Sequence, residues 1–219
     1  VTSIPWTAAH DKLITAVAGK QTPDVPQLGS TSAGEFDKLN VLDAVPSTIT
    51  PDQFYQGAID AGTVNNKLVG VPWYVDTRVL YYRTDLAQNA GMTQAPQTWD
   101  DLNKLASAYQ AGGAKYGIAL SSNNWQEYAP FLYSAGGDIM QGGKFTLDSP
   151  EAVKALTEYV TFFKGNLTPQ TQPQGFDVTQ TFVAGDTPMF FSGPWHKSLI
   201  AKAAPQLEGK WQTARVPKD

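Results

Sequence analysis

Two strong helix signals separated by short apolar stretches constrain the fold of this chain more than any other feature. Thr98–Asp101 has the form of a capping box, and apolar residues follow it at helical spacing as far as a Gly-Gly pair at 112–113. Ser149-Pro150 begins a second helix, with proline at a position where its missing N–H costs nothing. Apolar residues at 116–120 and 188–191 predict short strands. This alternation of helices and strands favours an α/β fold.

The helix predicted over residues 149–164 is expected to pack on the sheet through one apolar face. Its large apolar side chains recur three or four residues apart, which places them on one side of a helix. The expected core positions are Val153, Leu156, Val160 and Phe163. Weaker patterns predict helices over residues 7–20, 52–61, 85–90, 127–135 and 178–184, and a hairpin turn at 65–67.

Composition excludes several classes of function. Of the 219 residues, 42% are hydrophobic and 16% charged, which is typical of a globular protein with one or two domains. The net charge is −4 and Lys and Arg form no cluster in the sequence, so no nucleic-acid partner is expected. Cysteine is absent, and two histidines are too few for a three-histidine zinc site. Because no nucleotide or metal motif occurs either, we expect no cofactor and no metal.

The segment Val71–Tyr82 combines a predicted strand with acidic, basic and aromatic side chains. Strand periodicity would place Tyr74, Asp76 and Arg78 on one face and aliphatic residues on the other. Such a face could bind a polar ligand, because carboxylates accept hydrogen bonds and an aromatic ring packs against an apolar surface. The alternative is that Asp76 and Arg78 only pair with each other on a solvated edge.

Two further stretches carry aromatic and amide side chains at positions that suit ligand binding. Asn124 and Trp125 follow the predicted strand that ends at Leu120, and loops after strands bind ligands in α/β folds. Trp195 follows a Gly-Pro turn, which favours an indole outside the deep core. The alternatives are that Asn124 only caps a helix and that either indole packs as core. Glu127 has the weakest claim, since it could simply face solvent.

Five motifs resemble one family, the extracellular sugar-binding proteins of ABC importers that are related to maltose-binding protein. They cover nearly the whole chain and read IPWTAAHDKLITAVAGKQTPDV, KLVGVPWYVDTRVLYYRTDL, PQTWDDL, YSAGGDIM and FVAGDTPMFFSGPW. One motif alone would be weak, because a turn such as GPW arises in many proteins. Five motifs in the family's order and at its spacing make the resemblance specific.

The resemblance implies an α/β protein with a two-lobed, periplasmic-binding-protein-like fold (type II). Residues 1–75 would form part of the first (N-terminal) lobe, 76–82 the hinge crossing, and 83–219 most of the second (C-terminal) lobe. It also implies that the chain is an internal segment in which the first lobe is incomplete. The missing N- and C-terminal parts would then lie on another segment or chain.

The resemblance also implies roles for particular residues. The acidic residue of the hinge strand, Asp76, would reach the sugar, and Trp195 would stack on it. Family members often carry tryptophan where this chain has Ser32, so one aromatic platform of the first lobe is expected to be absent. The residues and the resemblance together predict the ligand-binding set Tyr74, Asp76, Arg78, Asn124, Trp125, Trp195, Thr31 and Ser32.

The expected function is binding of a mono-, di- or oligosaccharide between two closing lobes and its delivery to the permease subunits of an ABC transporter. The protein would be extracellular or periplasmic, with a lipid anchor as one option, although no signal-peptide pattern precedes Val1. One alternative is a glycoside hydrolase, which needs two placed carboxylates where only Asp76 and, less well, Glu127 are candidates. The other is a non-catalytic surface adhesion domain. No nucleophile elbow is present, and we expect no enzyme.

Overall fold

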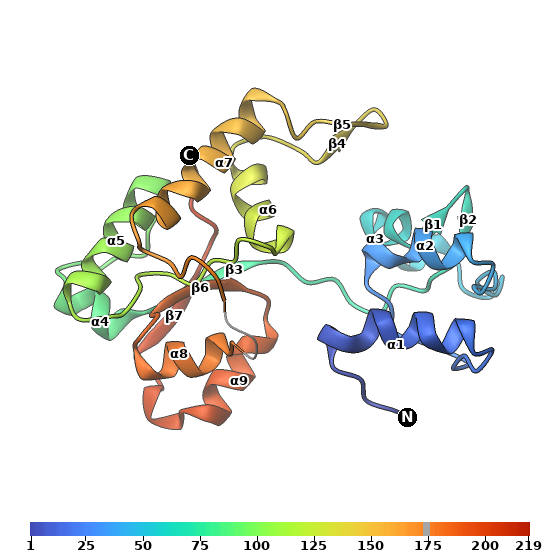
Figure 1. Cartoon of the computed structure of the whole chain (residues 1–219), viewed down its shortest axis with the longest axis horizontal. Coiled ribbons are helices and arrows are strands. Elements are labelled where there is room, and N and C mark those ends of the chain that lie inside the picture. The colour runs from blue at the N-terminus through green and yellow to red at the C-terminus, as the bar shows by residue number, and fades with distance from the viewer. Residues whose placement is uncertain (173–175) are drawn as a thin grey trace. The chain divides into compact units, whose positions relative to one another are not determined.

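The protein divides into two compact units, residues 1–75 and residues 76–219. Its structure is a computed structural model that describes residues 1–172 and 176–219 (Figure 1). The assignment of residues 76–82 to a hinge stays a prediction. The two units differ in the size of their cores and are described separately.

The first unit is built from short helices, one hairpin and long irregular segments (Figure 1). The predicted hairpin turn is confirmed, because Asn65 and Asn66 adopt φ values of 50° and 62°, the backbone that two-residue hairpins favour. The buried apolar side chains are few: Leu13, Ala33, Phe36, Ile59 and Val69. The elements are α1 (Trp6–Ala18), α2 (Ala33–Lys38), α3 (Gln56–Ala61), β1 (Thr63–Val64) and β2 (Lys67–Leu68), with 3-10 turns at Ser30–Ser32 and Pro51–Gln53.

The second unit surrounds a three-stranded antiparallel sheet in the order β6-β3-β7. Its strands are β3 (Val79–Arg83), β4 (Met140–Gln141), β5 (Lys144–Phe145), β6 (Met189–Ser192) and β7 (Trp211–Ala214). Its helices are α4 (Thr84–Asn89), α5 (Trp99–Ala111), α6 (Trp125–Ser134), α7 (Pro150–Lys164), α8 (Val178–Ala184) and α9 (Trp195–Ala203), with a 3-10 turn at Pro205–Leu207. Strands β4 and β5 form a separate hairpin.

Helices cover both faces of this sheet at β3 and β6, and these two strands are buried on both sides. Leu80 and Tyr82 of β3 point to the core formed with α4, α5, α6 and α7, whereas Tyr81 between them points to α8 and α9. In β6, Phe190 likewise joins Tyr81, and the two rings stack with centroids 5.0 Å apart. Since alternate side chains of a strand point to opposite faces, both faces of β3 and β6 are buried.

Both strong helix signals are confirmed at their N-termini. Thr98 and Asp101 form the predicted capping box of α5, and the Ser149 hydroxyl accepts a hydrogen bond from the Ala152 N–H at the start of α7. Because each cap satisfies backbone N–H groups that the helix leaves unpaired, these short motifs fix where the helices begin. The apolar face predicted for α5 is also buried: Leu102, Leu105, Ala106 and Tyr109.

The apolar face predicted for α7 is wrong by one residue. Val153 and Leu156 are 55% and 51% exposed, and Val160 and Phe163 are only partly buried. The buried stripe has the same spacing shifted by one position: Ala152, Ala155, Tyr159 and Phe162. Small alanines let α7 approach α6 closely, where Tyr159 and Phe131 pack edge to face at 5.2 Å. Close helix packing therefore outweighs the larger apolar surface of Val153 and Leu156.

The strand predicted over Val71–Tyr82 is also wrong for most of its length. Only Val79–Arg83 forms a strand, because β6 and β7 pair with β3 there and no described strand pairs with residues 71–78. Tyr74, Asp76 and Arg78 therefore do not share a strand face. The strand predicted at 116–120 is reduced to a single parallel bridge between Ala119 and Phe190, although its apolar residues are buried.

Residues 116–120 lie so close to α5 that one position requires glycine. A Cβ atom added to Gly117 would lie 2.1 Å from the carbonyl oxygen of Ala106, well inside contact distance. The backbone N–H groups of Gly117 and Ile118 both donate to the carbonyl oxygen of Leu167. This close packing fixes the start of the loop that leads into α6.

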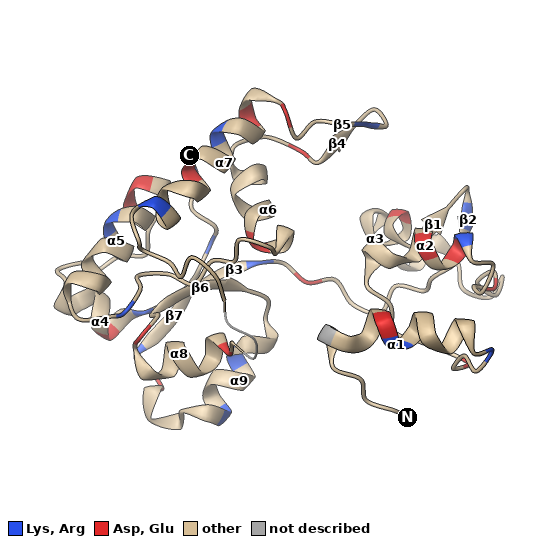
Figure 2. Cartoon of the chain, in the orientation of Figure 1, with Lys and Arg blue, Asp and Glu red and all other residues tan. Residues whose placement is uncertain are grey.

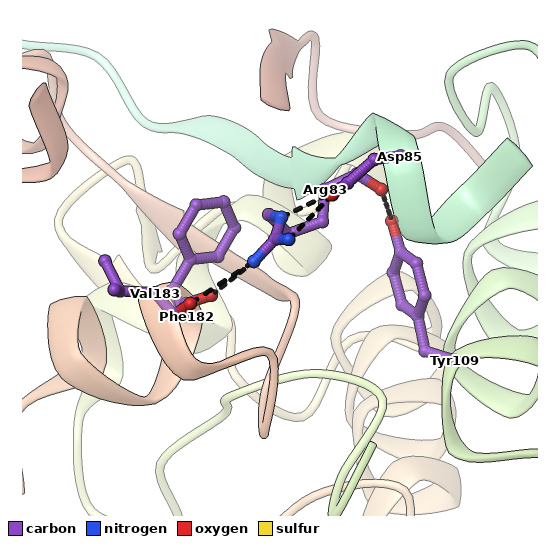
Figure 3. A network of polar contacts seen from close by, with 5 residues as sticks. All are labelled: Arg83, Asp85, Tyr109, Phe182 and Val183. Atoms are coloured by element: carbon purple, nitrogen blue, oxygen red, sulfur yellow. Dashed lines mark hydrogen bonds and ion pairs between the residues drawn. The ribbon is translucent and has the colours of Figure 1, made fainter. Parts of the chain in front are cut away.

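A buried arginine ties β3 to α8 (Figure 3). The Arg83 guanidinium forms a two-point ion pair with Asp85, at 2.8 and 2.7 Å, and donates to the carbonyl oxygens of Phe182 and Val183 at the end of α8. Burial raises the pKa of the Asp85 carboxyl, but the hydrogen bond and charge of Arg83, together with backbone N–H groups at Leu86 and Asp85, lower it overall. The Tyr109 hydroxyl donates to the Arg83 carbonyl at 2.7 Å and so adds α5 to the network.

The charged residues are spread over many elements. Figure 2 shows Lys and Arg dispersed over elements of both units. Within the described residues, none of the helices has the length and apolar character needed to cross a membrane.

Candidate functional site

A cavity of about 290 Å³ lies in the second unit, at the end of the sheet where β3 begins and β6 ends. Val79 pairs with Ser192, so the residues just before β3 and just after β6 meet at this edge. The loop after Ala119 reaches the same edge, since Ala119 bridges to Phe190 in β6. The lining includes Arg78, Asn124, Glu127, Phe176, Phe191, Ser192, Trp195 and His196.

Trp195, the first residue of α9, gives the cavity its most exposed aromatic surface, 41% accessible. Its ring is packed tightly against the backbone of Gly193. A Cβ atom at residue 193 would lie 1.9 Å from Cζ3 of the indole, so a larger residue there would displace the ring. Gly193 is therefore needed for the position of Trp195.

Arg78 is brought to the cavity by the start of β3. Its guanidinium carbon lies 5.0 Å from the Trp195 ring centroid, over the ring, which is a cation–π arrangement. Its Nη2 group donates to Oε1 of Gln126 at 3.1 Å. Burial lowers the pKa of Arg78, and the nearby charges of Glu127 and Asp76 oppose that shift. The predicted alternative of an Asp76–Arg78 ion pair is not observed within 4.0 Å among the described residues.

Asn124 and Glu127, at the start of α6, contribute an amide and a carboxyl group to the lining. The Asn124 side chain accepts from the Gln126 N–H and so caps α6, as the structural alternative predicted, and it also lines the cavity. Glu127 accepts a 2.7 Å hydrogen bond from the Ser121 N–H and a longer one, 3.4 Å, from Asn124. Burial raises the pKa of Glu127 to about 7, against the opposing effects of the Ser121 N–H and Arg78.

Glu127 and His196 are the polar residues that sequence reasoning undervalued. Of the two possibilities left open for Glu127, the structure favours the site over solvent, because its carboxylate lines the cavity and accepts from Ser121 and Asn124. The only signal was its position three residues after Asn124, which places it in the first turn of α6. His196 lies 2.6 Å from the Ser192 hydroxyl through Nδ1, and burial lowers its pKa. Its place beside Trp195 was the available signal.

The structure brings together three of the eight predicted ligand residues: Arg78, Asn124 and Trp195 line the cavity. Trp125, at the start of α6, is 51% exposed, so the alternative that its indole packs in the core is wrong. It does not line the cavity either. Asp76 is exposed in the irregular segment before β3. Its role in binding stays a prediction.

The other three predicted residues belong to the first unit. The Tyr74 hydroxyl accepts from Gln27 at 3.3 Å, and its ring is exposed. Thr31 and Ser32 lie in the 3-10 turn that precedes α2, with Thr31 exposed and Ser32 partly buried. The contacts and exposure of these three residues do not indicate a role in ligand binding, and their binding roles also stay predictions.

The lining suits non-covalent binding of a polar ligand with an apolar face. It offers an indole, amide and carboxyl oxygens, and a guanidinium, which together can bind hydroxyls and stack on C–H groups. Among the described residues, no group of three His, Asp or Glu side chains could hold a metal ion.

Comparison with known proteins gives a consistent result over the whole chain. The sequence profile of the family described as bacterial extracellular solute-binding protein matches residues 1–219. The sugar-binding protein MalE of Xanthomonas citri is 32% identical with a TM-score of 0.76, and the match covers 100% of this chain and 58% of that one. An ABC transporter solute-binding protein of Thermotoga lettingae, solved with α-D-tagatose, is 28% identical with a TM-score of 0.82, covering 97% and 58%.

A curated relative extends the comparison to a named ligand. The diacetylchitobiose binding protein DasA of Streptomyces coelicolor is 25% identical over 216 residues, which are 93% of this chain and 49% of that protein. The chain spans about half the length of the curated relatives it matches. The likeness to solved structures confirms the predicted fold class, the α/β fold of two-lobed periplasmic binding proteins. The proteins named here are binding proteins.

Proposed function

Since this chain belongs to the family of bacterial extracellular solute-binding proteins, we propose that it binds a mono-, di- or oligosaccharide and delivers it to the permease subunits of an ABC transporter. The names of several relatives support a sugar as the ligand. In this proposal the protein acts outside the cytoplasmic membrane, in the periplasm or at the cell surface, and performs no chemistry on the sugar.

One observation carries the proposal, the cavity in which Trp195 lies beside Arg78, Asn124 and Glu127. An indole offers a large apolar face to sugar C–H groups, while the polar side chains can exchange hydrogen bonds with hydroxyls. Asp76, Tyr74, Trp125, Thr31 and Ser32 are proposed as further ligand residues.

A glycoside hydrolase is the rival function, and Glu127 is the residue that favours it. A carboxyl with a pKa of about 7 could act as a general acid near neutral pH. Glycoside hydrolysis requires a second carboxylate across the scissile bond, and Glu127 is the only carboxylate among the described lining residues. The cavity therefore supports binding better than hydrolysis.

Isothermal titration calorimetry against a panel of neutral and acidic mono- and disaccharides tests the proposal, with chromatography of the sugar afterwards. Saturable heat with unchanged sugar is the expected result. A sugar that has been shortened, or whose anomeric configuration has been inverted, would instead support the glycoside hydrolase. Absence of heat with every sugar would contradict sugar binding and favour an adhesion domain.

A further inference from the structure

Arg78 is the only Lys or Arg among the described residues that line the cavity. The chain contains three arginines, and the other two have different surroundings. The guanidinium of Arg83 is fully engaged by Asp85 and by carbonyl oxygens of α8. Arg215 is exposed and lies outside the cavity lining. Arg78 thus differs from the other two arginines because it places a cation at the wall of the cavity.

Two contacts hold the Arg78 guanidinium in place. The Trp195 ring lies under it at 5.0 Å, and Gln126 accepts one hydrogen bond from Nη2. Trp195 is itself fixed by its close packing on Gly193. A guanidinium that is already oriented loses less conformational entropy when it binds a ligand.

Most of the hydrogen-bonding capacity of Arg78 is unused. A guanidinium has five N–H donors, and within the described part of the chain only the bond to Gln126 engages one of them. No described carboxylate lies within 4.0 Å of it, in contrast to Arg83 with Asp85. The free donors form a planar fork that matches a carboxylate through two parallel hydrogen bonds.

The nearest acidic group opposes an anionic ligand only weakly near neutral pH. Glu127 is the one described carboxyl in the lining, and its oxygens are turned to the Ser121 N–H and the Asn124 amide. Because burial raises the pKa of Glu127 to about 7, a large part of it is uncharged at pH 6.5 to 7.

We infer that this cavity selects acidic sugars, and that Arg78, whose guanidinium lies over the Trp195 ring, binds the carboxylate of a uronic acid residue in the ligand. This inference rests on the proposed sugar-binding function and specifies its substrate class. Neutral sugars could also accept from Arg78, but a hydroxyl offers a single, uncharged acceptor. The carboxylate uses two donors at once and neutralises the buried charge.

The test is calorimetric titration with matched pairs that differ only at C6: D-glucuronic acid against D-glucose, D-galacturonic acid against D-galactose, and digalacturonic acid against galactobiose. At pH 6.5, at least one acidic member should bind about 10-fold or more tightly than its neutral partner. Raising NaCl from about 50 to about 300 mM should weaken the acidic sugar and leave the neutral sugar nearly unchanged.

Three variants assign the preference to Arg78. Arg78→Gln should weaken the acidic sugar roughly 10- to 100-fold and the neutral partner by a smaller factor, so that the preference for the acidic member is abolished. Arg78→Lys keeps the charge without the fork and should recover only part of the loss. Arg215→Gln removes the same charge at an exposed position and should leave both affinities unchanged.

The outcomes separate this inference from the function on which it rests. Equal or tighter binding of the neutral members would overturn the selectivity and leave sugar binding intact. A preference for acidic sugars that survives Arg78→Gln would overturn the role of Arg78. Absence of binding for every member of every pair would overturn the inference together with the proposed function. An unchanged thermal midpoint in the variants shows that they fold.

Discussion

The two units of this protein differ in how far their aromatic side chains are buried against one another. In the second unit, aromatic rings form a continuous core, with Phe131 packed against Trp99, Tyr159, Phe162 and Phe191. In the first unit, large rings are exposed, including Trp73 at 84% and Tyr55 at 80%. The folding free energy therefore resides mainly in residues 76–219, because more apolar surface is removed from water there.

The largest expected effect comes from matched buried phenylalanines in the two units. Phe131→Ala should lower the free energy of unfolding by about 3–5 kcal/mol, because Phe131 is 1% exposed and contacts four other rings. Phe36→Ala should cost about half as much or less, since within the described residues the only ring paired with Phe36, which is 3% exposed, is that of the exposed His10. Urea denaturation followed by near-UV circular dichroism measures both. Equal losses of unfolding free energy in the two variants would contradict the conclusion that most of the folding free energy resides in residues 76–219.

The next effect is a pH dependence specific to Glu127. Its pKa is about 7 when folded and 4.5 ordinarily, so the folded state binds more protons between these values. The contribution to stability is fully present below pH 4.5 and is lost as the pH rises through 7, by up to about 3 kcal/mol.

Glu127→Gln isolates that contribution, because glutamine can keep the Ser121 bond and cannot ionise. The difference in unfolding free energy between the wild type and Glu127→Gln should shift in favour of the variant from pH 5 to pH 9. Subtraction removes the titration of other groups, including His196. Two parallel stability curves would show that Glu127 titrates normally.

A smaller effect concerns ligand binding and compares the two units directly. Trp195→Ala should weaken sugar binding by roughly 1–3 kcal/mol, because it removes an apolar platform and the support of Arg78. Asp76→Asn is expected to cost a similar amount if its charge accepts sugar hydroxyls. Thr31→Ala and Ser32→Ala should each cost no more than about 1 kcal/mol, the value of one neutral hydrogen bond. If calorimetry showed a larger loss of binding free energy for Thr31→Ala or Ser32→Ala than for Trp195→Ala, the first unit would contribute more to binding than the second.

The smallest effect lies on the outer face of α7. Leu156→Ser should change stability by less than about 0.5 kcal/mol because that side chain is half exposed, whereas Tyr159→Ala three residues later should cost several times more. Thermal unfolding of the two variants side by side is sufficient. A large loss from Leu156→Ser would restore the face expected from the sequence.

Local signals in the sequence predicted local structure well. The capping box at Thr98 and the Ser149-Pro150 start depend on hydrogen bonds within four residues, so a single segment contains all the information required. The same holds for the turn at Asn65-Asn66, whose backbone conformation is one that asparagine tolerates.

Features that depend on distant partners could not be predicted from the segment alone. Residues 71–78 have the β-branched and aromatic composition of a strand, but a strand also needs a neighbour, and β6 and β7 pair only with residues 79–83. In α7, the buried stripe depends on how closely α6 approaches, which favours Ala152 and Ala155.

The candidate site was predictable in part for the same reason. Trp195 is predicted by the Gly-Pro turn before it and by the family resemblance, and Asn124 by its place after a predicted strand. Arg78 is predicted by a strand periodicity that the structure does not show, although it does line the cavity. The altered pKa of Glu127 depends on burial and on the Ser121 N–H, and the bond between Ser192 and His196 depends on how α9 starts. These interactions arise from packing, and the sequence indicates only that Glu127 follows Asn124 in the first turn of α6 and that His196 is next to Trp195.

The position of Trp195 also makes the cavity optically observable. Its indole is partly open to water and carries a guanidinium over the ring, and indole emission responds to both the polarity of its surroundings and a nearby charge. A ligand that covers the ring or draws Arg78 away from it would change the wavelength and intensity of this emission. Trp6, Trp73 and Trp125 are also exposed, so the spectrum of Trp195→Phe must be subtracted to isolate the signal. The protein therefore carries an intrinsic fluorophore at the place where ligand occupancy would be recorded, without any attached dye.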